Sequence, residues 1–432
     1  MMLATPMMTA SPNDVCLTAH LGKHRIIATI GSNIILSEAK NIISPRGDAS
    51  FDKHMNLCYN NKKGGVAMKE INSIQHSGSS AGIFYTVENG IAVITGCDED
   101  LSNIVIADSY EGFPVRRIAP FAFCKHDKII SVKLPQSLLE IGEKAFYRCS
   151  SLKSISIPDT VNSIGKRAFG FCTALSSVTL PRKLSKISNY TFIGCKSLEY
   201  IELPKGLISI GRYAFSDCGI LQANLPQALR SIGDYAFSGA SLNSVEIPAS
   251  VVYLGEWSFS SCKHLKSLIF ADRCLLKSIE RGAFRGCASL SAVSFSEKGS
   301  LRIIGNEAFY ECSAISSLDL PQSLEVIGGR AFFSCDKLTD ITLPKNLSSI
   351  GLQAFKYCSA LESISIPDTV KFIWEETFLG CDSLKKLRLE NPYGWQINGK
   401  SIYADELSDP TRATRIFTYE LAHNELINTF NK

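Results

Sequence analysis

The chain has 432 residues, and its 45 lysines and arginines against 41 aspartates and glutamates give a formal net charge of only +4 at pH 7. A charge this balanced argues against a nucleic-acid-binding protein and against electrostatic binding to anionic membranes. Hydrophobic residues make up 45% of the chain, which is ample for a buried core, but no apolar run is long enough for a transmembrane helix. We therefore expect no nucleic-acid partner and no membrane insertion.

The first 83 residues show no repeat and little periodicity. Their main apolar stretch is RIIATIGSNIIL at 25–36, and polar residues interrupt it. A basic start, an apolar run and a small-residue cleavage site do not follow one another as they do in a secretory signal. We predict that 1–83 is a poorly structured N-terminal extension.

A candidate translation start lies inside this extension. The codons for Lys63, Gly64 and Gly65 can spell a purine-rich bacterial ribosome-binding sequence shortly before Met68. The hypothesis is that translation begins at Met68 and that 1–67 is translated upstream sequence. Peptide mapping of the natural N-terminus tests it, because abundant peptides from 1–67 would contradict it.

Residues 84–118 are predicted to form an N-terminal cap. Asn89 and Gly90 lie between two β-rich runs, and Asn-Gly is the strongest short signal for a hairpin turn. The segments NIVIAD at 103–108 and FPVRRI at 113–118 predict two further strands. We expect this cap to lead into the first repeat.

A repeated phrase dominates 119–390 and is clearest at 338–358, which reads LTDITLPKNLSSIGLQAFKYC. A fixed period in the low twenties with regularly spaced Leu and Ile predicts a leucine-rich-repeat solenoid. The phenylalanine of the phrase recurs at spacings of 22–25 residues, as Phe123, Phe146, Phe169, Phe192, Phe215, Phe237, Phe259, Phe284, Phe309, Phe332, Phe355 and Phe378. We predict about twelve coils of 22–25 residues, with a parallel β-sheet on one face.

Each repeat supplies the elements of one coil. Leu152, Ile155 and Ile157 have the alternation of a half-buried strand. Pro158 ends that strand because proline cannot donate a ladder hydrogen bond. Gly165 is expected at a left-handed backbone position. No coil closes a core alone, so stacked coils must cover one another's apolar faces.

Several coils depart from the phrase. Its glycine is replaced by Ser188, Glu280 and Trp374, so those turns are expected to differ locally. The segments 270–279 and 295–304 lack the strand-ending proline and carry two extra residues each. We expect a longer loop in these two adjacent coils.

Ten of the fifteen cysteines occupy one repeat position: Cys149, Cys172, Cys195, Cys218, Cys262, Cys287, Cys312, Cys335, Cys358 and Cys381. Stacked thiols could form bridges or attract soft metals, but cysteine is commonly buried as a small hydrophobe. We favour a buried core ladder. Unpaired thiols in this number favour a reducing compartment. His126 takes the position in the first coil, where we expect it to face solvent.

The pattern stops after 390, and 391–432 are predicted to form a C-terminal cap. Trp395 is expected to pack on the last coil. Asp409 and Pro410 suit an N-cap and a first helical position. A helix over 411–430 is expected to shield the open end of the core, as terminal repeats must.

The repeated I-G-x-x-A-F-x-x-C-x-x-L, the segment YTVENGIAVITG at 85–96 and the segment NPYGW at 391–395 resemble the BspA-like leucine-rich repeat family. The resemblance covers 84–432. It implies adhesion and binding of host or matrix proteins, often at a cell surface. It does not imply catalysis.

One candidate binding surface is the exposed sheet position between the two buried residues of each strand. Solenoids bind partners with such extended faces, although a merely soluble face is an equal alternative. The column contains Lys133, Ser156, Thr179, Glu202, Asn224, Glu246, Ile269, Ser294, Asp319, Thr342, Ser365 and Arg388.

A second candidate is an aromatic strip two residues before the repeat phenylalanine, formed by Tyr190, Tyr213, Tyr235 and Trp257. Exposed Tyr and Trp suit docking of a protein or a carbohydrate. The alternative, which we favour, is that these rings lean over the turn and cover the convex side.

No constellation of catalytic residues is recognisable. The seven histidines do not form H-x-x-x-H, H-E-x-x-H or paired C-x-x-C patterns. A nucleophile elbow, a P-loop and a dinucleotide fingerprint are also missing from the sequence. We expect no enzyme activity, no cofactor and no metal site.

The sequence therefore predicts a non-enzymatic, monomeric scaffold whose ligand is a protein or a glycan. The alternative is a structural or assembly module without a dedicated ligand. The abundant thiols and the lack of a signal favour a cytoplasmic location. The family resemblance favours the cell surface, or secretion without a recognisable signal peptide.

Overall fold

The computed structural model describes residues 15–21, 24–30, 80–397, 400–418 and 426–428. The chain divides into two units, 1–65 and 66–432. In the first unit, β1 (Val15–Leu21) and β2 (His24–Ile30) form an antiparallel pair within the segment expected to have little structure. The rest of 1–79 lies outside the described residues. Among the described residues, no helix has the length and apolarity needed to cross a membrane.

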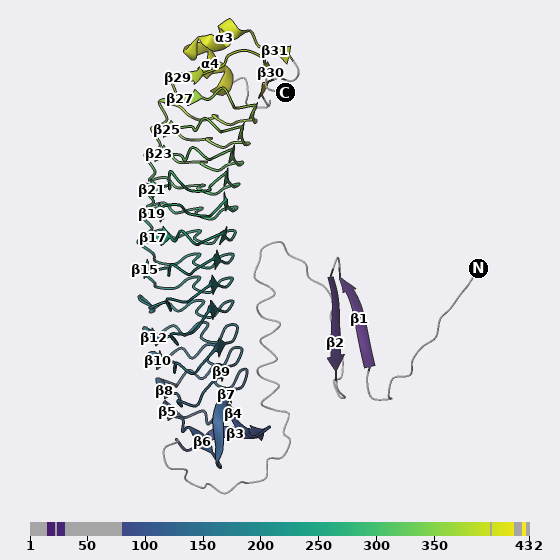
Figure 1. Ribbon diagram of the computed structural model, residues 1–432, viewed down its shortest axis with the longest axis vertical. Helices are drawn as coiled ribbons and strands as arrows, with labels where there is room; N and C mark the ends of the chain where they lie inside the picture. The colour runs from purple at the N-terminus through teal and green to yellow at the C-terminus, as the bar shows by residue number, and fades with distance from the viewer. Residues whose placement is uncertain (1–14, 22–23, 31–79, 398–399, 419–425, 429–432) are drawn as a thin grey trace, which may run out of the picture. The chain divides into compact units, whose positions relative to one another are not determined.

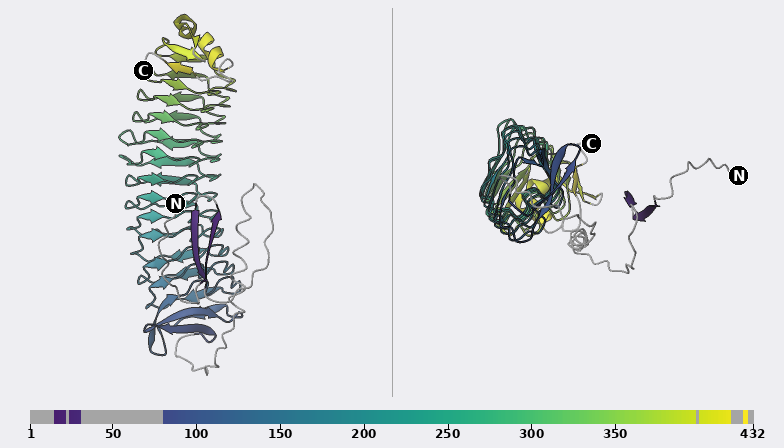
Figure 2. Two further views of the ribbon diagram at one scale, coloured as in Figure 1. Left: turned by 90° about the vertical axis from the view of Figure 1, so that its right-hand side faces the viewer. Right: turned by 90° about the horizontal axis from the view of Figure 1, so that it is seen from below.

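The second unit is a solenoid of about thirteen stacked turns of chain. The turns are seen from the side in Figure 1 and end on in the right-hand view of Figure 2. In the first ladder, the strands before the proline pair in parallel and in register over four separate stretches, at 103–179, 222–294, 317–342 and 363–389. Its strands are β5 (Asn103–Val105), β8 (Ser131–Lys133), β10 (Ser154–Ser156), β12 (Ser177–Thr179), β15 (Gln222–Ala223), β17 (Ser244–Ile247), β19 (Ser267–Phe270), β21 (Ala292–Ser294), β23 (Ser317–Asp319), β25 (Asp340–Thr342), β27 (Ser363–Ile366) and β29 (Lys386–Leu389). This is the predicted parallel sheet.

A second ladder, which the sequence did not predict, runs along another side of the coils. It uses the short segment before the repeat glycine, and its pairs are again parallel. Its strands are β7 (Phe113–Ile118), β9 (Glu140–Ile141), β11 (Ser163–Ile164), β13 (Lys186–Ile187), β14 (Ser209–Ile210), β16 (Ser231–Ile232), β18 (Tyr253–Leu254), β20 (Ser278–Ile279), β22 (Ile303–Ile304), β24 (Val326–Ile327), β26 (Ser349–Ile350) and β28 (Phe372–Ile373).

The third side of each coil is the turn around the repeat phenylalanine. The residues two before and two after it have positive φ, as Arg167 (56°) and Phe171 (58°) do. Their backbone groups bond from coil to coil, for example Arg167 N to Asn189 O at 3.1 Å. These turns therefore form a third line of hydrogen bonds, in which non-glycine residues adopt the left-handed conformation.

The prediction for Gly165 was wrong, because its φ is not positive. Its role is close approach: a Cβ there would lie 2.5 Å from Glu143 N of the preceding coil. Gly351 has the same role, since its Cβ would lie 2.5 Å from Gly329 N. Glycine at this position lets neighbouring coils meet at the ladder spacing.

The core runs the length of the stack. Neighbouring repeat phenylalanine rings, from Phe123 to Phe378, lie 5.0–5.6 Å apart with planes within 18° of parallel. The ten ladder cysteines are free and buried, as predicted. Each thiol donates to the carbonyl of the phenylalanine in the preceding coil over 2.8–3.4 Å. The thiol hydrogen bonds and the stacked phenylalanine rings therefore link each coil to the one before it.

At the N-terminal end, β3 (Ile83–Glu88) and β4 (Ile91–Cys97) pair antiparallel around Asn89 and Gly90, and β6 (Ser109–Tyr110) pairs with β7. His126 was expected to face solvent, and this expectation was wrong. The cap covers it, leaving it 7% exposed with Nε2 3.6 Å from Cys97 Sγ.

At the C-terminal end, α3 (Ala404–Ser408) and α4 (Pro410–Thr418) cover the last coil. Asp409 Oδ1 accepts a hydrogen bond from Thr411 N at 2.9 Å. The helix is shorter than the expected 411–430, because β32 (Leu426–Asn428) is a strand between β28 and β30 (Trp395–Ile397); β31 (Lys400–Ser401) pairs with β30. Trp395 is buried there.

Candidate functional site

The aromatic strip is a continuous stack. Tyr190 and Tyr213 lie 5.0 Å apart between ring centroids, Tyr213 and Tyr235 lie 4.6 Å apart, and Tyr235 and Trp257 lie 6.1 Å apart, with planes within 12°. All four residues have positive φ, so the turn directs every ring the same way. Each inner ring is covered on both faces by its neighbours.

The ends of the strip are also covered. The Arg167 guanidinium lies 4.4 Å from the centroid of Tyr190, and those of Arg281 and Arg285 lie within 5.7 Å of Trp257. Gly282 follows Trp257 in the column, and a Cβ there would lie 2.5 Å from the indole. The ring faces are thus engaged within the protein, which favours the interpretation that the strip covers the turn and presents only edges and hydroxyls.

The predicted sheet column lies on the exposed face of the first ladder, and all twelve of its residues are exposed. Small hydroxyl side chains stand in register there, as Ser156 beside Thr179 does. A shallow hollow of about 360 Å³ interrupts the face between β15 and β19. Its only charged lining residue is Glu246. Apart from Ile269, the column is polar.

The exposed face of the second ladder is different in its C-terminal half. Ile303, Val326, Ser349 and Phe372 occupy one register position on β22, β24, β26 and β28. Ile303 is 41% exposed and Phe372 40% exposed. Val326 and Ser349 between them are partly exposed, so three apolar side chains and one hydroxyl form a partly exposed stripe.

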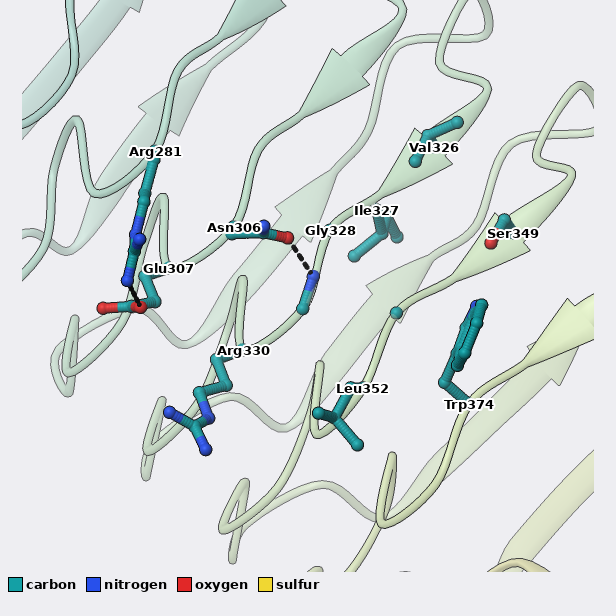
Figure 3. Close-up of a pocket in the computed structure, with 12 residues that line it drawn as sticks. Arg281, Asn306, Glu307, Val326, Ile327, Gly328, Arg330, Ser349, Leu352 and Trp374 are labelled. Carbon is teal, nitrogen blue, oxygen red and sulfur yellow. Dashed lines mark hydrogen bonds and ion pairs between the residues drawn. The ribbon is translucent and has the colours of Figure 1, made fainter. Parts of the chain in front are cut away.

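Beside this stripe is a hollow, which we call the Trp374 notch (Figure 3). It has a volume of about 540 Å³. Trp374, which is 44% exposed, and Leu352 stand on one side, and Asn306 with the Arg281–Glu307 pair on the other. The hollow exists because Gly328 and Gly329 form its floor without side chains.

Trp374 replaces the repeat glycine, and this explains its exposure. Its backbone N bonds to Ile350 O at 3.0 Å, as Gly351 N bonds to Ile327 O at 2.8 Å one coil earlier. The coil before Trp374 thus has glycine in the same column. Gly351 has no side chain that could cover the indole, in contrast to the rings that cover one another in the aromatic strip.

The acidic and the basic side chains of the notch differ in whether they have a partner of opposite charge. Glu307 accepts from Arg281 at 2.7 Å and from Arg285. Burial by itself would raise the pKa of the Glu307 carboxyl, but the two guanidinium hydrogen bonds outweigh it and lower this pKa. Arg330 donates from Nε to Gln353 Oε1 at 2.5 Å, and no carboxylate among the described residues pairs with it.

Sequence reasoning identified Trp374 only as a departure from the repeat, and it missed the notch. The available signal was the coincidence of two departures two coils apart: an extra glycine at 329 and a tryptophan at 374. Their meeting depends on the second ladder, which was not predicted. The sheet column and the strip were placed as columns correctly, but the structure does not bring them together into one site.

Within the described residues, no group of three or more His, Cys, Asp or Glu side chains is arranged to hold a metal ion. Burial raises the pKa of Cys172, Cys218 and Cys358 well above the usual thiol value, and that of Cys381 to about 12. They are therefore neither nucleophiles nor metal ligands in the folded chain. Their role is in the core.

Known proteins resemble the solenoid. A crystal structure of a leucine-rich repeat protein from Bacteroides ovatus is 27% identical and covers 73% of this chain and 100% of its own, with a TM-score of 0.49. A leucine rich cell surface protein from Faecalibacterium prausnitzii is 24% identical, covering 65% and 92%, with a TM-score of 0.38. The pneumococcal vaccine antigen PcpA is 17% identical, covering 72% and 92%, with a TM-score of 0.44.

No curated protein matches the chain. The family model for the BspA type leucine rich repeat region (6 copies) matches 116–241, 185–300 and 277–396. These matches cover more than half of the chain and the coils that carry both ladders. The protein therefore belongs to the BspA-type leucine-rich repeat family.

Proposed function

We propose that the chain is a non-enzymatic scaffold that binds a protein or a glycan through the exposed face of its second ladder. The observation that carries this proposal is the Trp374 notch, an open hollow with a half-exposed indole beside an apolar stripe. Apolar and aromatic side chains around a concave surface are typical of binding sites. The exposed column of the first ladder has no aromatic side chain, and the strip has its ring faces covered.

A non-enzymatic scaffold agrees with the family, whose members are repeat proteins that are typically non-enzymatic. Adhesion is the more specific role that we propose. Trp374 in the notch offers an anchor of the kind that adhesive contacts need, because tryptophan is among the residues that contribute most to binding energy at interfaces.

The experiment compares variants of the immobilised full chain in affinity capture, with mass spectrometry of the bound proteins and glycans. Phe372→Ser with Trp374→Ser should abolish capture of the partner. Glu202→Lys with Glu246→Lys on the first-ladder face is the matched control and should leave it unchanged. The proposal fails if the first pair has no effect and the control pair abolishes capture.

A further inference from the structure

We infer that the Trp374 notch binds an acidic saccharide, meaning a sugar ring that carries a carboxylate. This inference rests on the proposed function and names the ligand class of the same site. Three features carry it: an open aromatic wall, an excess of hydrogen-bond donors and an excess of positive charge. The notch volume of about 540 Å³ lies in the range of ligand sites.

The aromatic wall is the indole of Trp374. Gly351, which precedes it in the column, has no side chain to stack on the ring, and Trp374 is 44% exposed. A sugar ring has an apolar C–H face and a polar rim, so it can pack on an indole while its hydroxyls remain hydrogen-bonded. Leu352, also half-exposed beside the indole, extends the apolar wall.

The polar groups of the notch are mostly donors. Asn306 Oδ1 accepts from Gly329 N at 2.7 Å, which leaves the Asn306 amide NH₂ for a ligand. Ser349 contributes a hydroxyl without a hydrogen-bond partner among the described residues. The terminal nitrogens of Arg330 remain available while Nε donates to Gln353. Such a set requires a ligand rich in acceptors.

The charged side chains of the notch favour an acidic ligand. The charged lining residues are Arg281, Glu307 and Arg330. Both oxygens of Glu307 are engaged by Arg281 and Arg285, so the notch has no free carboxylate of its own. Arg330, which is exposed, can form a bidentate pair with a ligand carboxylate. Ligand charge and site charge are therefore complementary.

A peptide is the weaker candidate. Extended peptides commonly bind by adding a strand to an open sheet edge. The strands lining the notch have no open edge, because β24, β26 and β28 are each paired on both sides in the order β22-β24-β26-β28-β32. A sugar ring needs only the side-chain surface that the notch provides.

The test titrates the full chain with methyl β-glucuronide and methyl β-glucoside, which differ only in the carboxylate, and follows saturation-transfer NMR and tryptophan fluorescence. We expect the glucuronide to bind at least tenfold more tightly. Arg330→Gln should remove that difference, and Trp374→Ala should abolish binding of both sugars.

Two further variants separate the site from the fold. Gly329→Leu fills the notch and requires only a small shift of the Leu352 carbonyl, because its φ is not positive and its Cβ would lie 3.3 Å from Leu352 O; it should abolish binding. Arg302→Gln is the matched control, because Arg302 pairs with Glu325 on the same face outside the notch. Arg302→Gln should leave the affinity for both sugars unchanged.

Several outcomes overturn the inference: no binding of either sugar, equal binding of both, binding that survives Gly329→Leu, or tighter binding of acetyl-Trp-Glu-amide at the same residues. The affinity capture above distinguishes the two proposals. If capture still depends on Phe372 and Trp374 while neither sugar binds, the scaffold proposal stands and the saccharide is wrong. If capture does not depend on Phe372 and Trp374 and neither sugar binds, both proposals are wrong.

Discussion

The aromatic strip and the Trp374 notch place similar side chains on the same solenoid, with opposite results. In the strip, Tyr213 lies between two rings at 5.0 and 4.6 Å, so its faces are covered. In the notch, Trp374 follows Gly351 in its column and is 44% exposed. The comparison teaches that, in a stack of coils, the neighbouring coil determines whether an aromatic residue stabilises the fold or is available to a ligand.

The largest expected effect separates two glycines of the notch. Gly351→Leu should destabilise the chain by about 2–3 kcal/mol, because its Cβ would lie 2.5 Å from Gly329 N and force the coils apart. Gly329→Leu should leave stability within about 0.5 kcal/mol. Urea unfolding followed by circular dichroism measures both. Equal losses would show that the notch floor is not the open surface described.

The next effect contrasts the two kinds of aromatic residue. Tyr213→Ala should cost about 1–2 kcal/mol, since it interrupts a stack with neighbours on both faces. Trp374→Ala should cost less than about 0.5 kcal/mol, as expected for a surface residue. Thermal unfolding of the two variants gives the comparison. A greater loss for Trp374→Ala would mean that the indole is part of the packing.

A spectroscopic prediction follows from the three tryptophans of the chain. Trp395 is 1% exposed and Trp257 is stacked on Tyr235, whereas Trp374 is half-exposed. Iodide should therefore quench mainly Trp374, and Trp374→Phe should remove most of the quenchable fluorescence. Trp257→Phe should retain it; the reverse pattern would exchange the roles assigned to the two regions.

The smallest effect concerns the core behind both regions. Burial holds the pKa of Cys218 and Cys335 well above the usual value, so these thiols are protonated and unreactive at neutral pH. Trp374→Ala should leave the count of thiols that react rapidly with Ellman's reagent unchanged from the wild type. An increase would show that the notch opens into the core rather than onto the surface.

Much of the architecture was predictable because a repeat multiplies weak local signals. The first ladder, the phenylalanine column and the buried thiols follow from alternation and spacing alone. The left-handed turns were not predictable at Arg167 and Phe171, because any residue type occupies these positions. The second ladder was missed because strands of two residues carry too little pattern.

The candidate site was harder to predict from the sequence than the architecture was. Trp374 was visible as a departure, but a departure does not show whether a ring is stacked or exposed. The same limit applied to His126, where an edge coil was expected to face solvent and the hairpin cap instead leaves it 7% exposed. In both cases the neighbour that decided the outcome belongs to a different part of the chain.

By itself, the sequence determined the stack of coils: its period, its family, its buried columns and its lack of recognisable catalytic motifs. These properties depend on residue spacing within one repeat, which is written along the chain. The tertiary structure decided which surfaces remain open, because exposure depends on the side chain that the next coil or a cap places against each position. The notch at Gly329 and Trp374 exists only through that pairing of coils.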